Sequence, residues 1–486
     1  MAAFLALLAP LIHAGAGDSD TASYLIEARQ IADGRMTIPP RAIPGFVTTG
    51  ISDYVYIPLG LRPSPVAPGE LVPTYPIGFP SMIAAAHHFL DWEEASNLVI
   101  LAHSLLGLVL VYALGRTLEF GRIWCWAGTV LIATGPLYLR SSLQGMSDIP
   151  AMVWTCAAAL AGWRARNSKA WAAVTGVALS ISVLIRPNEV LLLAPLLVAW
   201  WPIGPARPAP GLFLRSLLFV GGGVPGGVFW LLYNRHVYGG ALVTSYGDVK
   251  GLFLTDLLPT TLRFYAHWLP VVFTPVVWLC LGLPWAARRS RAAAFLGVWA
   301  GVFLALFAFN RYIDDSWSLI RYVLPAAPAL VFGGLAVARR LLGQPYFQGR
   351  RWPRVVATLA LAAALAGQIQ WDGKLKVLYA GRGQFTYPLA MSWLNTHLPP
   401  GSILAAMQTS PAAFFYTDFP VVRWDELDPG SFRLLAKTAA SQGRAIYAPL
   451  FAFEEQRALV ANMPGRWSVA SRVRQVTIWR YDGDRP

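Results

Sequence analysis

The sequence is poor in charge and in cysteine. Lys, Arg, Asp and Glu make up 13% of the 486 residues, about half the usual share of a soluble domain, while hydrophobic residues reach 56%. This balance excludes an ordinary water-soluble enzyme. Cys125, Cys156 and Cys280 lie within apolar runs and lack the spacing of a zinc or redox motif, so we expect no disulfide framework.

The net charge of +14 would suggest a nucleic-acid partner in a soluble protein. Here the basic residues instead separate apolar runs that are long enough to cross a bilayer. We therefore expect membrane lipids as partners, and no nucleic acid.

Long apolar runs dominate the first 370 residues. A run of about 20 apolar residues crosses a bilayer as a helix, because lipid cannot hydrogen-bond exposed backbone groups. The pattern predicts an α-helical polytopic membrane protein with about eleven transmembrane helices, near residues 1–16, 97–115, 123–139, 149–163, 170–185, 190–203, 216–233, 264–286, 292–309, 319–338 and 355–370. The first run is short and also fits a signal sequence that ends near Ala14–Gly17.

Basic residues indicate the orientation, since Lys and Arg in short loops stay cytoplasmic. With the N-terminus inside, the inner loops hold fifteen basic residues, among them Arg207, Arg339 and Arg340, and one acid, Glu119. We predict a multi-pass protein of the inner (plasma) membrane with a cytoplasmic N-terminus. Residues 76–90 are expected to form an interfacial helix within a large first outer loop, residues 15–96.

The pattern changes after residue 370. Ser402–Met407, Ala445–Leu450 and Val473–Tyr481 are typical of strands, and Phe453–Asn462 of a helix. We therefore predict two domains, a transmembrane domain at 1–370 and a small extracytoplasmic α/β domain at 371–486.

The first outer loop begins with two carboxylates, Asp18 and Asp20. Such a pair can act as a general base or hold a divalent cation. The alternative is that Asp18 or Asp20 caps a helix from about Thr21 to Ala32, with Glu27 and Arg29 in solvent. The two roles do not exclude each other.

Further charges flank the apolar runs. Asp148 lies where one predicted span ends and the next begins, so Ser147 or Asp148 can cap a helix, or Asp148 can serve in a site. The segment Arg186-Pro187-Asn188-Glu189 is typical of a tight hairpin between spans, and a role in ligand binding is its alternative.

One arginine begins a predicted span. Arg321 either extends toward the headgroups or clamps a phosphate with its planar guanidinium, and Arg311 lies in the segment before it.

The order of these motifs over residues 10–340 resembles the GT-C superfamily of integral-membrane glycosyltransferases, in the bacterial branch similar to protein O-mannosyltransferases and aminoarabinose transferases. The motifs are Gly17-Asp18-Ser19-Asp20 with Tyr24 and Ala28-Arg29, Tyr75-Pro76-Ile77-Gly78, Asp148-Ile149-Pro150, Arg186-Pro187-Asn188, and Arg321-Tyr322 with Pro325 and Pro328.

The resemblance implies a GT-C-like fold and an inverting hexosyl- or pentosyltransferase that uses a polyprenyl-phosphate sugar at the outer membrane face. The acceptor would be a lipid, polysaccharide or protein of the cell envelope. Asp18 is the best match to the catalytic carboxylate, with Asp20 as its alternative and Asp148 as a further catalytic candidate. Candidate substrate-binding residues are Tyr24, Tyr75, Arg235, Arg311 and Arg321. A flippase, transporter or polymerase for lipid-linked glycans is the alternative function, and a divalent cation is a further option.

Overall fold

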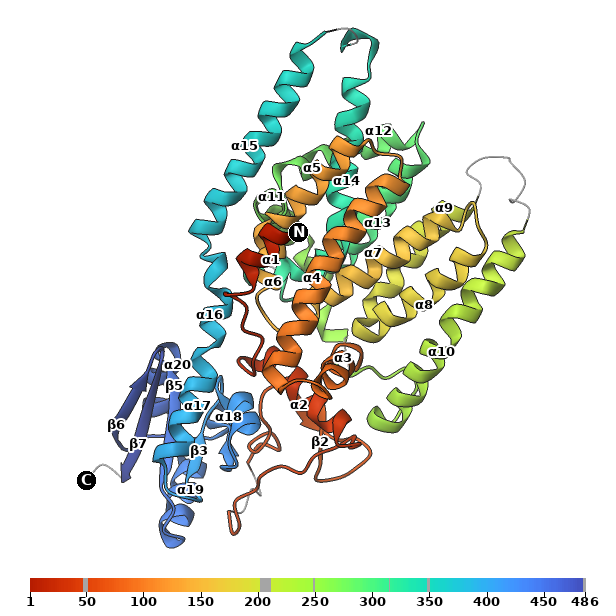
Figure 1. The fold of residues 1–486 in the computed structure, drawn as a ribbon. Helices are drawn as coiled ribbons and strands as arrows, with labels where there is room; N and C mark the ends of the chain where they lie inside the picture. The colour runs from red at the N-terminus through yellow and green to blue at the C-terminus, as the bar shows by residue number, and fades with distance from the viewer. Residues whose placement is uncertain (47–50, 202–210, 248–249, 314, 348–349, 484–486) are drawn as a thin grey trace.

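The computed structural model describes residues 1–46, 51–201, 211–247, 250–313, 315–347 and 350–483 (Figure 1). A bundle of helices takes up most of the chain, and a small sheet lies near the C-terminus. The helices of the first 374 residues are α1 (Ala2–Leu8), α2 (Ser19–Ala32), α3 (Gly78–His87), α4 (Trp92–Thr117), α5 (Arg122–Ala133), α6 (Pro136–Ser141), α7 (Asp148–Arg164), α8 (Ala170–Ile185), α9 (Leu193–Trp200), α10 (Leu212–Tyr238), α11 (Leu258–Val272), α12 (Leu283–Ala287), α13 (Arg291–Phe307), α14 (Ala327–Leu342) and α15 (Trp352–Lys374).

Four continuous helical segments within the described residues are long and apolar enough to cross a membrane: Trp92–Thr117, Leu212–Tyr238, Trp317–Leu342 and Trp352–Lys374. In α10 the most apolar stretch is only 6% buried within the protein. So much exposed apolar surface fits contact with lipid and not with water.

Several predicted spans are interrupted. The run at 123–139 divides into α5 and α6, and the run at 264–286 divides at Thr274 into α11, a 3-10 segment and α12. Pro136 and Pro275 cause these breaks, because proline disfavours helical geometry in the residue before it and starts a new helix.

The ends of two predicted spans also differ from expectation. The run at 1–16 is helical only in α1, which is about 10 Å long and cannot cross a bilayer alone. Residues 202–203 of the sixth run, and Arg207, lie outside the described residues.

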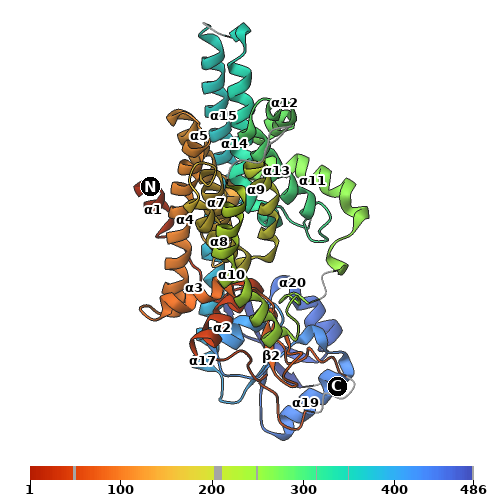
Figure 2. The same cartoon turned by 90° about the vertical axis from the view of Figure 1, so that its right-hand side faces the viewer.

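The predicted interfacial segment forms a short helix. Residues 76–90 contain α3, which packs against α2 and α4 and contributes Phe79 and Ile83 to their shared core. We call the end of the bundle that carries α2 and α3 the sheet end, because the C-terminal sheet also lies there. We call the opposite end, where α14 and α15 connect, the hairpin end (Figures 1 and 2).

The C-terminal part forms a five-stranded mixed sheet in the order β4-β3-β5-β7-β6. Strands β3 (Ile403–Ala405), β4 (Val421–Val422) and β5 (Ile446–Phe451) are parallel, and β6 (Arg466–Val473) and β7 (Val476–Gly483) form an antiparallel hairpin at the edge. The accompanying helices are α16 (Ala380–Gln384), α17 (Thr386–His397), α18 (Ser410–Tyr416), α19 (Pro429–Ser441) and α20 (Ala452–Gln456). The predicted strand at 402–407 contains β3, and the one at 445–450 covers β5 except its last residue, whereas the one predicted at 473–481 begins at the last residue of β6 and crosses the hairpin turn into β7. The predicted helix at 453–462 is α20 followed by a π-helical turn.

The sheet has a hydrophobic core on each face, because successive strand residues point to opposite sides. Leu404 contributes to the core formed with α17 and α18, and Ile403 to the core formed with α19. The core on the α19 face also includes Ile43, Phe46 and Val55, which belong to the N-terminal loop before α3. This loop also contains a two-stranded ribbon of β1 (Leu61–Pro63) and β2 (Leu71–Pro73). The loop and the sheet are therefore packed together, although more than 300 residues separate them in the sequence.

Candidate active site

Asp18 caps α2. Its backbone is extended, and Oδ1 accepts hydrogen bonds from the Thr21 amide at 3.1 Å and the Thr21 hydroxyl at 3.0 Å. Its second oxygen, Oδ2, accepts a hydrogen bond from Gln384 Nε2 at 3.0 Å. Of the two carboxylates that the sequence offered as a cap, the structure gives this role to Asp18.

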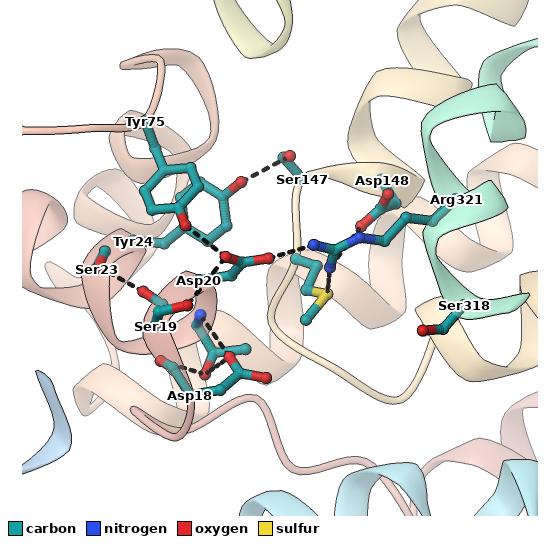
Figure 3. A network of polar contacts seen from close by, with 12 residues as sticks. Asp18, Ser19, Asp20, Ser23, Tyr24, Tyr75, Ser147, Asp148, Ser318 and Arg321 are labelled. Carbon is teal, nitrogen blue, oxygen red and sulfur yellow. Dashed lines mark hydrogen bonds and ion pairs between the residues drawn. The ribbon is translucent and has the colours of Figure 1, made fainter. Parts of the chain in front are cut away.

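Asp20 points toward the helical bundle, where it meets an arginine from a distant part of the chain. One carboxylate oxygen pairs with Arg321, and the other accepts a hydrogen bond from the Tyr75 hydroxyl (Figure 3). The side chains of Asp20 and Arg321 are 19% and 15% exposed, so the pair is shielded but reachable. Arg321 lies in a 3-10 segment, Trp317–Ala326, that directly precedes α14 and has Ser316 as its N-cap.

A second ion pair lies beside the first. Asp148, at the first turn of α7, is fully buried and pairs with Arg186 at 2.8 Å, while Arg321 Nη1 lies 4.0 Å from its other oxygen. Ser147 is the N-cap residue of α7, but its side chain makes no capping bond. The two carboxylates and two arginines form one continuous cluster, which we call the charge cluster: Asp20, Asp148, Arg186 and Arg321.

Two tyrosines line the charge cluster on the α2 side. The rings of Tyr24 and Tyr75 lie 4.8 Å apart. The Tyr24 hydroxyl lies 2.9 Å from the Ser147 hydroxyl, which also accepts a hydrogen bond from Arg186 at 3.1 Å. Both tyrosines predicted to bind substrate are therefore part of the site's wall.

The surroundings shift the pKa values of these groups. Burial alone would raise the pKa of Asp20, but the charge of Arg321 and the Tyr75 hydrogen bond hold it below its usual value. Burial, with the negative charge of Asp20, raises the pKa of the Tyr75 hydroxyl well above its usual value. Asp20 is thus an ionised acceptor, and Tyr75 is a neutral donor.

Three polar atoms of the charge cluster are buried without a hydrogen-bond partner in the described part of the chain: Arg186 Nη1, Arg321 Nε and Asp148 Oδ2. Buried polar atoms normally find a partner. The two nitrogens are donors, and they suit the oxygen atoms of an anionic ligand.

The structure separates two of the predicted phosphate-binding residues from the charge cluster. Arg235, on α10, and Arg311 are both exposed. Arg311 lies over the Tyr312 ring at 5.9 Å, and no contact joins Arg235 or Arg311 to Asp20 or Asp148 in the described residues.

The structure extends the site with Arg186 and Gln384. Arg186 was expected mainly to shape a hairpin, yet its guanidinium completes the charge cluster. Its position after a long apolar run, like that of Arg321, was the available signal. Gln384 gave no such signal, because it reaches Asp18 from a helix 366 residues away.

Glu27 and Arg29 are not solvated as expected. Glu27 is 1% exposed, with Tyr233 as its hydrogen-bond donor at 3.3 Å, and burial raises its pKa well above the usual value. Arg29 is half-buried and lies over the Phe415 ring at 4.0 Å. The prediction placed them in solvent because local sequence does not show that α10 and α18 cover this part of α2.

The charge cluster does not fit a divalent cation. Arginine and tyrosine hydrogens occupy the Asp20 oxygens, and Thr21 and Gln384 occupy those of Asp18. In the ranges that the structure describes, no three His, Cys, Asp or Glu side chains gather as a metal site would require.

Solved structures of membrane glycosyltransferases resemble this architecture. The chain matches the aminoarabinose transferase ArnT from Cupriavidus metallidurans bound to undecaprenyl phosphate with a TM-score of 0.55 and 15% identity, over 99% of this chain and 96% of ArnT. It matches ArnT in the apo state with a TM-score of 0.54 and 16% identity over the same shares. The mycobacterial arabinofuranosyltransferase AftD gives a TM-score of 0.47 and 14% identity, over 95% of this chain and 41% of AftD.

No protein-family model and no curated protein sequence matches this chain. The likeness to ArnT, a member of the GT-C superfamily, nevertheless extends over nearly the whole length of both chains. The structure therefore shares its fold with ArnT, in line with the fold that the resemblance of the sequence motifs implied.

Proposed function

We propose that this protein is an inverting glycosyltransferase that takes a sugar from a polyprenyl-phosphate donor and transfers it to an acceptor in the cell envelope. The observation that carries the proposal is the charge cluster at the sheet end of an ArnT-like fold, with its unpartnered arginine nitrogens. A structure of ArnT holds undecaprenyl phosphate, which supports the same class of lipid as the donor here.

Arg321 and Arg186 are suited to hold the donor's phosphate. A guanidinium binds two phosphate oxygens at once in a planar fork. In the described structure Arg321 already holds a carboxylate oxygen of Asp20, so an incoming phosphate competes with Asp20 for the same donors. Donor binding therefore frees one Asp20 oxygen.

This exchange prepares Asp20 as the base. Once phosphate neutralises Arg321, the pKa of Asp20 rises from its lowered value and the carboxylate accepts a proton more readily. The acceptor hydroxyl then forms a bond to the anomeric carbon and gives its proton to Asp20. The bond from that carbon to the phosphate oxygen breaks on the opposite face, and the arginines stabilise the departing polyprenyl phosphate.

The geometry thus favours Asp20 over Asp18 as the base, in contrast to the order of preference from the sequence. Both Asp18 oxygens are committed to capping α2 and to Gln384. We propose Asp18 as a positioning residue, and Asp148 as the partner that holds Arg186 in place.

We also propose that the sheet end faces outward, with a cytoplasmic N-terminus and residues 371–486 outside. Arg339, Arg340, Arg350 and Arg351 lie around the connection of α14 to α15 at the hairpin end, which supports that end as cytoplasmic. A phosphatase fusion at residue 486 should be active and a fluorescent-protein fusion dark. Fluorescence in the cytoplasm would contradict this orientation.

The transfer reaction can be tested directly. Purified protein in proteoliposomes with a mixture of polyprenyl-phosphate sugars should consume one of them when envelope extract is supplied, and Asp20→Asn should not. Mass spectrometry of envelope lipids and glycans from a deletion strain should show an acceptor that lacks one sugar. Flipping of the lipid-linked sugar without its consumption would favour a transporter instead.

A further inference from the structure

A pocket separate from the charge cluster lies between the helical bundle and the C-terminal sheet. Its volume is about 290 Å³, and we call it the junction pocket. The residues of its wall that matter here come from α6, the turn after α15, α16, α17 and the β6–β7 turn: Arg140, Lys376, Gln384, Tyr387 and Gln475. Two cations and three glutamines, counting Gln144, line it, and no carboxylate does.

The cations at the junction pocket are free to bind a ligand. Lys376 is exposed, and its ammonium group makes no ion pair or hydrogen bond within the described ranges. Arg140 lies over the Trp317 ring at 5.4 Å, and Arg474, beside Gln475, lies over the Phe385 ring at 5.4 Å. Neither arginine has an acidic partner among the described residues.

Backbone conformation also sets these cations apart. Lys376 and Arg474 have φ values of +51° and +53°, a region that favours glycine. Lys376 follows the end of α15, and Arg474 lies in the tight turn between β6 and β7, so glycine or asparagine would suit both positions better. Of the three non-glycine residues with positive φ in the described chain, Lys376 lines the pocket, and Arg474 adjoins in sequence Gln475, which also lines it.

The junction pocket is coupled to the proposed active site through Gln384. Its side chain lines the pocket and binds Asp18 twice, by donating to Oδ2 at 3.0 Å and accepting from the amide at 3.3 Å. Asp18 begins the helix whose first turn carries Asp20. A group held in the pocket thus lies next to the turn of α2 that presents the base.

We infer that the junction pocket binds an anionic group, a phosphate or carboxylate, on the sugar acceptor. This inference rests on the proposed function, because it makes the pocket the acceptor's anchor beside Asp20. The free cations supply charge, and the glutamines supply hydrogen bonds to saccharide hydroxyls. The anionic group belongs either to a lipid headgroup or to a soluble glycan.

Inorganic pyrophosphate is a suitable probe, with full-length protein in phosphatidylcholine nanodiscs. Pyrophosphate should raise the thermal unfolding midpoint, and Lys376→Gln with Arg474→Gln should raise its half-saturating concentration about tenfold or more. The matched control is Lys374→Gln with Arg472→Gln, two exposed cations that neither line the pocket nor adjoin in sequence a residue that does. The donor site is intact in both pairs, so its contribution is the same.

A second pair of variants separates binding from folding. Lys376→Gly with Arg474→Gly relieves the positive φ, so this protein should be at least as stable as the parent yet lose the same pyrophosphate response. Equal losses in the pocket and control pairs would mean a diffuse basic surface, and no response in any protein would mean no site. Either result overturns the inference.

Lipid composition distinguishes the two sources of the anion. Phosphatidic acid in the nanodisc should weaken pyrophosphate binding if the pocket is open to a lipid headgroup, and leave it unchanged if it takes a soluble glycan. The binding assay needs no transfer. If Asp20→Asn abolishes transfer but the pocket variants bind normally, this inference fails alone. If the pocket variants lose binding but Asp20→Asn transfers normally, the proposed catalytic role fails instead.

Discussion

Arginines occur at both ends of the helical bundle but bind different partners. At the sheet end, Arg186 and Arg321 pair with Asp148 and Asp20. At the hairpin end, Arg339 and Arg340 in the last turn of α14 donate to the backbone carbonyls of Glu119 and Ala286, at 2.8 and 3.0 Å. A carbonyl partner satisfies a helix end, whereas a carboxylate partner can be exchanged for another anion. The kind of partner therefore distinguishes these two sets of arginines.

The largest expected effect is the loss of the base. Asp20→Asn keeps the shape of the side chain but removes its basicity, so the transfer rate should fall about a hundredfold or more. Glu119→Gln, the matched change at the hairpin end, should leave the rate unchanged. Both are measured in proteoliposomes with a labelled donor. A normal rate in Asp20→Asn with an inactive Asp18→Asn would return the catalytic role to Asp18.

Breaking the buried pair should have the largest effect on stability. Arg186→Gln removes the hydrogen-bonded cation of the fully buried Asp148 and leaves only Arg321 at 4.0 Å, and removal of one member of such a pair costs about 3–5 kcal/mol. Arg340→Gln removes a bond to a carbonyl and should cost about 1 kcal/mol. Thermal unfolding in detergent compares the two. Similar small losses would show that the charge cluster is accessible to water.

Arg321→Lys tests whether the guanidinium fork matters. Lysine keeps the charge but loses one of two charge-assisted hydrogen bonds, so the KM for the donor should rise about ten- to hundredfold. Arg340→Lys is the control, because Arg340 lies at the hairpin end and donates to a backbone carbonyl. Tolerance of lysine at both positions would mean that Arg321 only anchors the helix at the membrane surface.

Glu27→Gln should have the smallest effect. Because the pKa of Glu27 is raised in the folded state, the folded protein holds a proton that the unfolded chain releases, and stability falls as the pH rises above the ordinary value of 4.5. Glutamine removes this dependence, so the variant should unfold at a higher temperature than the parent at pH 8 and at a similar one at pH 4. Equal differences at both pH values would point to a packing effect.

The sequence predicted individual elements well where a single physical signal dominated. The apolar run at 170–185 coincides with α8. Asp148, Asp20 and Arg321 were predicted as site residues because charged side chains beside apolar runs are costly. The resemblance of the motifs also implied a fold that the chain shares with ArnT. The helix breaks within the spans at 123–139 and 264–286 were not predicted, because the spans were assigned from the average hydrophobicity of each run and not from its prolines.

Contacts between residues far apart in the chain could not be predicted from the sequence. Nothing near Asp20 indicates that Arg321 is its partner, and nothing near Arg235 or Arg311 shows that both remain exposed. The same limit applies to the choice between Asp18 and Asp20, which the resemblance left open, because the second oxygen of Asp18 is engaged by a glutamine that only the tertiary fold brings near.

The contact between the N-terminal loop and the C-terminal sheet also constrains when the protein can mature. Asp18 bonds to Gln384, and the Ile57 carbonyl to Arg423, each across 366 residues of chain. A ribosome that adds about 5–20 residues per second needs roughly 20–70 s to make that length. These contacts cannot form until most of the chain has been synthesised. Asp18, and with it the first turn of α2 that carries Asp20, therefore reaches its final position only when translation is nearly complete.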